Sequence, residues 1–96
     1  MAKFNIIDAN KNTIEVDGLI IYEDGAFWGI HFKFPSFVMS HLETGSEIIT
    51  GKSILAVVNA GIYQMKKKPE FTAKCLREKI EFLGEKYPVN KVPVCR

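Results

Sequence analysis

Two side chains capable of acid–base chemistry, His41 and Glu47, flank a turn in the stretch SFVMSHLETGSEIIT. Glu43, Thr44 and Gly45 between them predict a three-residue hairpin loop in which the glycine adopts the left-handed conformation. In this hairpin His41 would face Glu47 from the neighbouring strand. A histidine facing a carboxylate can serve as a general base, but the sequence places no serine or cysteine nucleophile nearby. We therefore favour an ordinary polar pair on the strand surface and keep a small enzyme as an alternative.

A second candidate is a phosphate-binding loop from Gly45 to Ser53, which ends in Gly-Lys-Ser and leads into an apolar segment. The phosphate-binding motif has four residues between its glycines, so that successive backbone N–H groups wrap the phosphates. Here five residues separate the glycines, and Glu47 among them would repel phosphate. The stretch instead predicts a strand, a turn and a helix start capped by Thr50. No nucleotide or other cofactor is expected.

The histidines and cysteines do not show the spacing of a metal site. None of His31, His41, Cys75 and Cys95 forms a short pair such as C-x-x-C or H-x-x-x-H, so no metal is expected. Cytosolic thiols usually stay reduced, and both cysteines are therefore predicted to be free thiols.

The stretch FWGIHFKF interleaves aromatic and basic residues, as strands that stack single-stranded bases do. Strand alternation would direct its tryptophan to the core and leave a partly aromatic, partly basic outer face. The net charge is only +2, so no strong general field attracts nucleic acid. Nucleic-acid binding is a second alternative, with candidate residues Phe27, His31, Lys33, Lys66, Lys67 and Lys68.

The segment from about Gly51 to Lys67 predicts a helix that is uncharged around most of its circumference. Its expected core stripe consists of Ile54, Leu55, Val58, Ile62 and Met65. A helix that is apolar on all sides must be covered on all sides, either within the fold or by a partner. The candidate interface residues, on the far side of this helix and on the next one, are Val57, Ala60, Tyr63, Phe71 and Phe82.

Hydrophobic alternation and turn residues predict strands in the first part of the chain. The pairs Asp17-Gly18 and Asp24-Gly25 both suit two-residue hairpin turns. The alternative is one long strand from Thr13 to Glu23, which would place Glu15 and Asp17 on the face of the apolar residues. Turns at both positions instead pair Ile21 with Trp28 and collect the apolar residues on one face, so a β-meander is preferred. Lys3 to Ile7 is predicted to add a further strand.

The final helix is expected to begin near Pro69 and to end before Pro88. Its apolar stripe consists of Ala73, Leu76, Ile80, Leu83 and Tyr87. The predicted fold is a single α+β domain over residues 1–96, with a β-rich part over about 1–50, two helices over 51–87 and an extended tail over 88–96. Both helices are expected on one face of an antiparallel sheet.

The order HLETG followed by TGKS and an alanine-containing helix resembles a pattern in small uncharacterised proteins of phages and other mobile elements. The resemblance covers roughly Phe37 to Lys66. It implies a phage or mobile-element origin and carries no assigned chemistry. The uncharged Val57-Val58 pair departs from the more polar helices expected of that group.

Length and composition complete the prediction. The chain has 96 residues and is 47% hydrophobic, which suits one globular domain, and its longest uncharged run is too short to span a bilayer. The sequence therefore predicts a cytoplasmic, non-enzymatic interaction module that self-associates as a homo-oligomer. No membrane association is expected.

Overall fold

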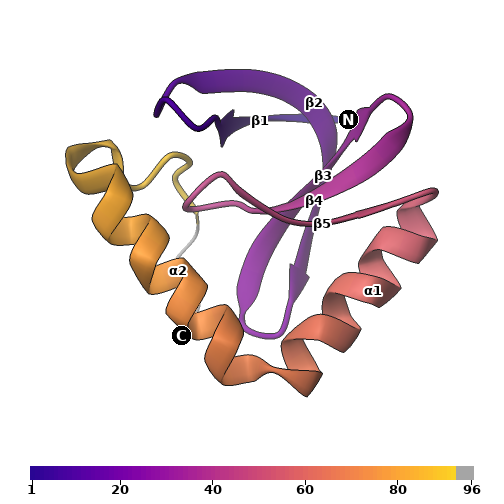
Figure 1. Cartoon of the computed structure of the whole chain (residues 1–96). Helices are drawn as coiled ribbons and strands as arrows, with labels where there is room; N and C mark the ends of the chain where they lie inside the picture. The colour runs from indigo at the N-terminus through magenta and orange to yellow at the C-terminus, as the bar shows by residue number, and fades with distance from the viewer. Residues whose placement is uncertain (93–96) are drawn as a thin grey trace.

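The computed structural model describes residues 1–92, which form an antiparallel sheet followed by two helices (Figure 1). The strands lie in sequence order, with bounds β1 (Ala2–Ile7), β2 (Thr13–Glu23), β3 (Ala26–Lys33), β4 (Ser36–His41) and β5 (Ser46–Gly51). The helices are α1 (Ile54–Lys67) and α2 (Pro69–Leu83), and a short 3-10 turn, η1 (Gly84–Lys86), follows. The predicted α+β fold with an antiparallel sheet is confirmed.

Strand β2 is continuous, so the predicted turn at Asp17-Gly18 is wrong. The first part of β2 pairs with β1, from Ile7 opposite Thr13 to Ala2 opposite Gly18. The second part pairs with β3, beginning at Gly18 opposite His31. A Cβ atom on Gly18 would overlap the Ile30 carbonyl oxygen. This glycine therefore permits close strand packing where the two ladders meet, and it does not form a turn.

The second predicted turn is confirmed. Asp24 and Gly25 both have positive φ, at 53° and 79°, as a two-residue hairpin turn requires. The turn sets the register of β2 and β3, with Ile21 opposite Trp28. The aromatic and aliphatic residues of these strands therefore share the face on which the helices pack.

The hairpin of β4 and β5 forms, but its register changes within the ladder. Met39 lies opposite Ile49, whereas the next residue, Ser40, lies opposite Glu47. The intervening Ile48 is the extra residue of a β-bulge. His41 consequently lies opposite Ser46, one position away from the partner that the sequence predicts.

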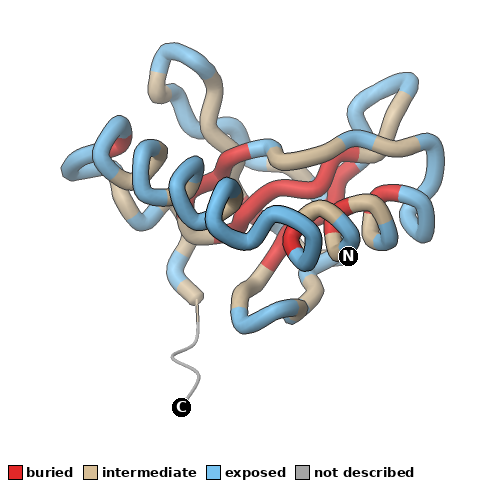
Figure 2. The backbone as a smooth tube through the Cα atoms, turned by 60° about the horizontal axis from the view of Figure 1, so that its bottom comes forward, coloured by how far each residue is buried: buried red, intermediate tan, exposed pale blue. Residues whose placement is uncertain are grey.

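The main core lies between the sheet and α1. Its buried members are Trp28, Ile30, Met39, Val57 and Met65. Figure 2 shows buried segments gathered along the middle of the sheet, with the outer sides of both helices exposed. The largest fully buried apolar side chains therefore lie between the sheet and α1.

Helix α1 packs on the sheet through a stripe that matches the predicted one only in part, because Met65 is buried and Val58 and Ile62 pack against the core, whereas Ile54 and Leu55 are exposed. Its buried residues are Val57, Gly61 and Met65, whereas Leu55 is 71% exposed. A Cβ atom at Gly61 would lie 2.5 Å from Met39 Sδ, so the glycine lets the helix come close to β4. The side of the helix with the smallest residue therefore faces the sheet.

The start of α1 also differs from the prediction. Ser53, and not Thr50, caps the helix, because the Ser53 hydroxyl accepts a hydrogen bond of 3.0 Å from Ala56 N. Thr50 and Gly51 still belong to β5.

Helix α2 lies on the same face of the sheet as α1, as predicted. Ala73 and Leu76 line a hollow together with Trp28 of β3 and Met65 of α1. Only Leu83 of this helix is buried, and Ala73 of the predicted stripe is exposed. Helix α2 is therefore less closely packed than α1, and the two helices diverge below the sheet (Figure 1).

On the other face the sheet curls, and β1 approaches the loop between β4 and β5. Ile7 N donates a 3.1 Å hydrogen bond to Gly45 O. The Asn90 side chain joins the same two parts: its Oδ1 accepts from Asn5 N at 2.7 Å, and its Nδ2 donates to Asn5 O at 2.7 Å and to Leu42 O at 2.6 Å. The C-terminal segment therefore ties β1 to the β4–β5 hairpin. The end of the predicted tail, residues 93–96, lies outside the described residues.

Candidate functional site

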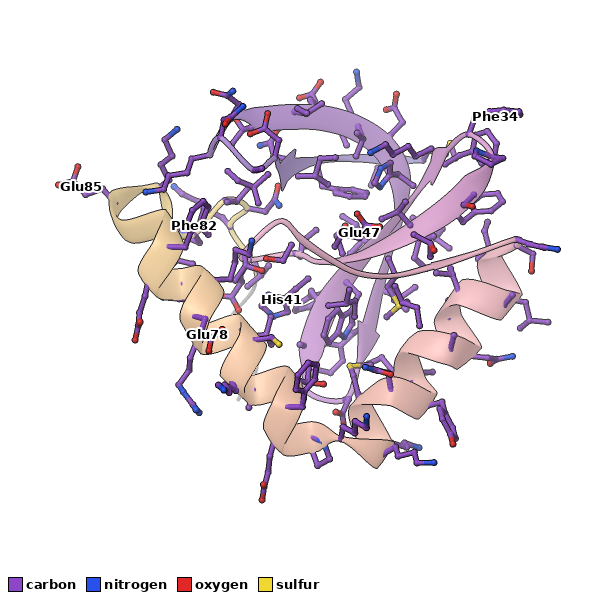
Figure 3. The ribbon with its side chains drawn as sticks, in the orientation of Figure 1. Phe34, His41, Glu47, Glu78, Phe82 and Glu85 are labelled. Carbon is purple, nitrogen blue, oxygen red and sulfur yellow. The ribbon has the colours of Figure 1, made fainter. Side chains whose placement is uncertain are left out.

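The predicted pair of His41 and Glu47 does not form. The bulge in β5 shifts the register by one residue, and a shift of one residue in a strand moves a side chain to the opposite face. His41 is buried on the helix side, with its ring centroid 5.1 Å from that of Trp28 and its Nδ1 3.1 Å from Thr44 Oγ1. Figure 3 shows Glu47 projecting toward β1 and β2, away from His41.

The environment of His41 suits a structural role. Burial lowers its pKa below the ordinary value of 6.5, and the nearby Glu43 carboxylate opposes this shift. The neutral imidazole contacts Thr44, whose hydroxyl also accepts a hydrogen bond from Ser46 N at 3.3 Å. His41 therefore helps to hold the β4–β5 loop.

Of the residues predicted to bind nucleic acid, His31 and Lys33 line one hollow, but the full set is not brought together. His31, expected to point outward, is 5% exposed and lies with its ring centroid 6.1 Å from that of Phe4. Phe27 is half-buried against Tyr22, at a centroid distance of 4.8 Å. Lys33 lies beside the β3–β4 turn, whereas the lysines 66–68 lie at the C-terminal end of α1, a helix about 20 Å long.

The predicted interface residues are also dispersed. Val57 is 0% exposed and belongs to the core, which removes it from the candidate interface. Tyr63 is exposed, and its hydroxyl accepts a 2.9 Å hydrogen bond from Lys67 Nζ. Phe71 and Phe82 lie near opposite ends of α2, and Ala60 is half-buried.

A different group of exposed apolar side chains lies on β2, the β3–β4 hairpin and the start of α1. We call it the hairpin surface, and it consists of Leu19, Phe32, Phe34, Ile54 and Leu55. Phe34 is 84% exposed at the tip of the β3–β4 hairpin (Figure 3). The Phe32 ring centroid lies 6.4 Å from that of Phe34 and 5.0 Å from that of Phe37. Phe37 pairs with Gly51, which lies shortly before α1. The three aromatic rings therefore extend from the hairpin toward the start of this helix.

Sequence reasoning missed this surface, although a signal was present. The stretch HFKFPSF carries aromatic residues on both sides of a proline, which cannot continue a central strand. Strand alternation assigned Phe32 to the core. In the structure Phe32 is exposed, because β2 changes its pairing partner from β1 to β3 at Gly18. Phe32 therefore lies beyond the last pair of the β2–β3 ladder.

Charged residues border the hairpin surface. Lys52 precedes α1. Asp17 lies on β2, two residues before Leu19 and on the same side of the strand. Both charged side chains are exposed, so the rim carries both signs.

Other site types find no support within residues 1–92. This part of the chain contains no cluster of three or more His, Cys, Asp or Glu side chains that could hold a metal ion. In the same range no helix is long and apolar enough to cross a membrane. Cys75 is an exposed free thiol, whereas Cys95 lies outside the described residues.

Comparison with known proteins gives no assignment. No protein-family model matches the sequence, and no match is found among curated proteins or among solved structures. The resemblance to phage and mobile-element proteins therefore stays an expectation.

Proposed function

We propose that this protein is a non-enzymatic interaction module that self-associates through the hairpin surface. The observation that carries the proposal is the exposure of its five apolar side chains over β2, the β3–β4 hairpin and the start of α1. Contiguous exposed apolar side chains with a polar rim are typical of protein interaction sites. Phe32 and Phe34 belong to this surface, and aromatic residues dominate the binding energy of many interfaces.

The charges on the rim favour a second copy of the chain as the partner. Lys52 lies two residues before Ile54 at the start of α1, and Asp17 lies two residues before Leu19 on β2. In a two-fold symmetric dimer the same patch meets itself, so a surface with both signs can pair its basic rim with the acidic rim of the partner. A surface of a single sign would instead repel its own copy.

The test is a concentration series by native mass spectrometry and light scattering on the full chain and on Leu55→Glu. Leu55 is largely exposed, so the substitution should leave the fold intact while placing a charge in the interface. We expect a dimer of the full chain and a shift of Leu55→Glu toward the monomer, with association weakened at least about tenfold by a charge in an apolar contact.

Tyr63→Glu is the matched control, because Tyr63 is exposed on the same helix but outside the hairpin surface. It should dimerise like the full chain. Loss of the dimer in Tyr63→Glu but not in Leu55→Glu would show that the interface lies on the Tyr63 side of α1, as the sequence predicted. A full chain that stays monomeric at all concentrations would contradict self-association.

A further inference from the structure

The concave side of the curled sheet contains a cleft of 290 Å³, between β1 and the β4–β5 hairpin. Aliphatic side chains line part of it, among them Ile6, Ile14 and Val38. Polar side chains from the central strands line the rest, with His31 from β3, Ser40 from β4 and Glu47 from β5. Apolar walls with a few convergent polar groups are typical of small-molecule sites.

The strand register brings these three polar residues together. Ser40 lies opposite Gly29 on one side and opposite Glu47 on the other. His31 is two residues from Gly29 and therefore shares its face of β3. A Cβ atom on Gly29 would lie 2.5 Å from the Phe4 ring, so the glycine makes room for β1 to cover this end of the concave side.

Two buried polar atoms in the cleft have no partner within the described residues. His31 is 5% exposed and Ser40 is 1% exposed, yet His31 Nδ1 and Ser40 Oγ make no hydrogen bond there. Leaving a buried polar group unpaired costs about 1–3 kcal/mol, so folded proteins rarely do so without a reason. Unpaired buried polar groups are expected at a functional site, where a bound ligand supplies the missing hydrogen bonds.

The charges of the cleft indicate which ligand it would accept. Burial lowers the pKa of His31, against the opposing effect of Glu47, so the imidazole is neutral and offers one donor and one acceptor. The carboxylates of Glu47 and Asp8 also line the cleft, with Lys33 as the basic residue there. This balance disfavours an anion and suits a neutral molecule.

We propose that the cleft binds a small neutral heterocycle of the nucleobase type. Its hydrogen-bonding edge would contact Ser40 and His31, and its ring would lie against Ile6 and Val38. A volume of 290 Å³ is at the lower end for ligand sites, which suits one or two fused rings. Since Ser40 Oγ and His31 Nδ1 do not bond to each other, no activated nucleophile is formed, and the cleft is assigned to recognition.

The experiment is a titration of the isotope-labelled full chain with adenine, cytosine and uracil, followed by NMR shifts of the backbone amides. At least one base should shift the amides of His31, Val38 and Ser40 in a saturable manner. Short single-stranded oligonucleotides of the same bases form a second arm. Tighter binding of an oligonucleotide with the same shifts would identify a base within a strand as the natural ligand, and tighter binding of the free base would identify a free heterocycle.

Ser40→Ala should weaken base binding at least tenfold without lowering the temperature of unfolding, because Oγ has no hydrogen bond to lose. Ser46→Ala is the matched control. Ser46 Oγ is likewise buried and unpaired, but Ser46 lines the hollow between β5 and the helices. It should leave binding unchanged. Glu47→Ala, at an exposed margin of the cleft, provides a second variant that should fold and should weaken binding about threefold.

The proposal would be overturned by the absence of saturable shifts in the cleft with all three bases and their oligonucleotides. Equal binding by the full chain and by Ser40→Ala would also overturn it. Shifts confined to the hairpin surface would assign the ligand to the opposite face of the sheet and would reject this cleft.

Discussion

Ser40 lies opposite Glu47 in the β4–β5 ladder, although the preceding residue, Met39, lies opposite Ile49. The bulged Ile48 between these two pairs places Glu47 on the concave side with Ser40, and leaves His41 on the helix side with Trp28. The extra residue in the edge strand β5 therefore places the Glu47 carboxylate on the face of the sheet that carries His31, away from His41.

The burial of both histidines predicts that acid destabilises the protein. The pKa values of His31 and His41 are lowered from 6.5, so the unfolded chain binds protons more readily than the folded one. Stability is then complete above about pH 6.5 and is lost as the pH falls toward the folded pKa values. Urea unfolding between about pH 7.5 and pH 5 should show this loss, at about 1.4 kcal/mol for each unit of pKa shift.

His41→Gln should reduce the slope of that pH dependence. Direct NMR titration of the two imidazoles gives an independent reading, and each should titrate below the value of an exposed histidine. An increase in stability on acidification through this range would contradict the assigned burial.

The side of α1 that faces the sheet can be tested with two substitutions. Val57 is fully buried whereas Leu55 is largely exposed, which is the reverse of the predicted helix stripe. Val57→Ala should lower the free energy of unfolding by about 2 kcal/mol, from lost apolar burial and a residual cavity. Leu55→Ala should change it by less than about 0.5 kcal/mol. Thermal and urea unfolding would measure both changes in the free energy of unfolding. A larger loss for Leu55→Ala than for Val57→Ala would show that the Leu55 side of the helix faces the sheet.

Gly61→Ala should destabilise the protein, although alanine is the better helix former. In an exposed helix the change would stabilise by about 1 kcal/mol. Here the added Cβ would lie 2.5 Å from Met39 Sδ, and Met39 is itself buried. We expect a loss of about 1–3 kcal/mol. Asn59→Ala, at an exposed position of the same helix, should show the usual small gain, and a similar gain for Gly61→Ala would argue against the close packing of α1 on β4.

Asn90→Ala should loosen the C-terminal segment and the start of β1 together. The Asn90 side chain makes three hydrogen bonds, to Asn5 N, Asn5 O and Leu42 O. Their loss should cost about 1–3 kcal/mol, because partly buried backbone groups are left unpaired. Hydrogen exchange should become faster at the Asn5 amide. Lys91→Ala, which removes an exposed neighbour, should leave the exchange rate at Asn5 unchanged.

The sequence alone was sufficient to predict an α+β fold with an antiparallel sheet. The prediction came from hydrophobic alternation, from the Asp24-Gly25 turn and from the helix limits at Lys67 and Pro69. These features are local: a turn with positive φ, a proline at a helix start and a periodic pattern each act within a few residues. The sequence alone also led to the prediction of a hairpin between β4 and β5 around Gly45.

Only the tertiary structure decided the features on which the two proposals rest. Three such features depend on contacts between segments far apart in the chain. They are the pairing of β2 with both β1 and β3, the bulge at Ile48 and the close packing of α1 on the sheet at Gly61. The bulge shifts β5 by one position, which exchanges the two faces of the strand, so Glu47 shares a cleft with His31 and Ser40. Phe32 lies exposed because it is beyond the last pair of the β2–β3 ladder, and His31 lies buried because Phe4 of β1 packs beside it. Val57 lies buried because α1 meets the sheet on the side that carries Gly61.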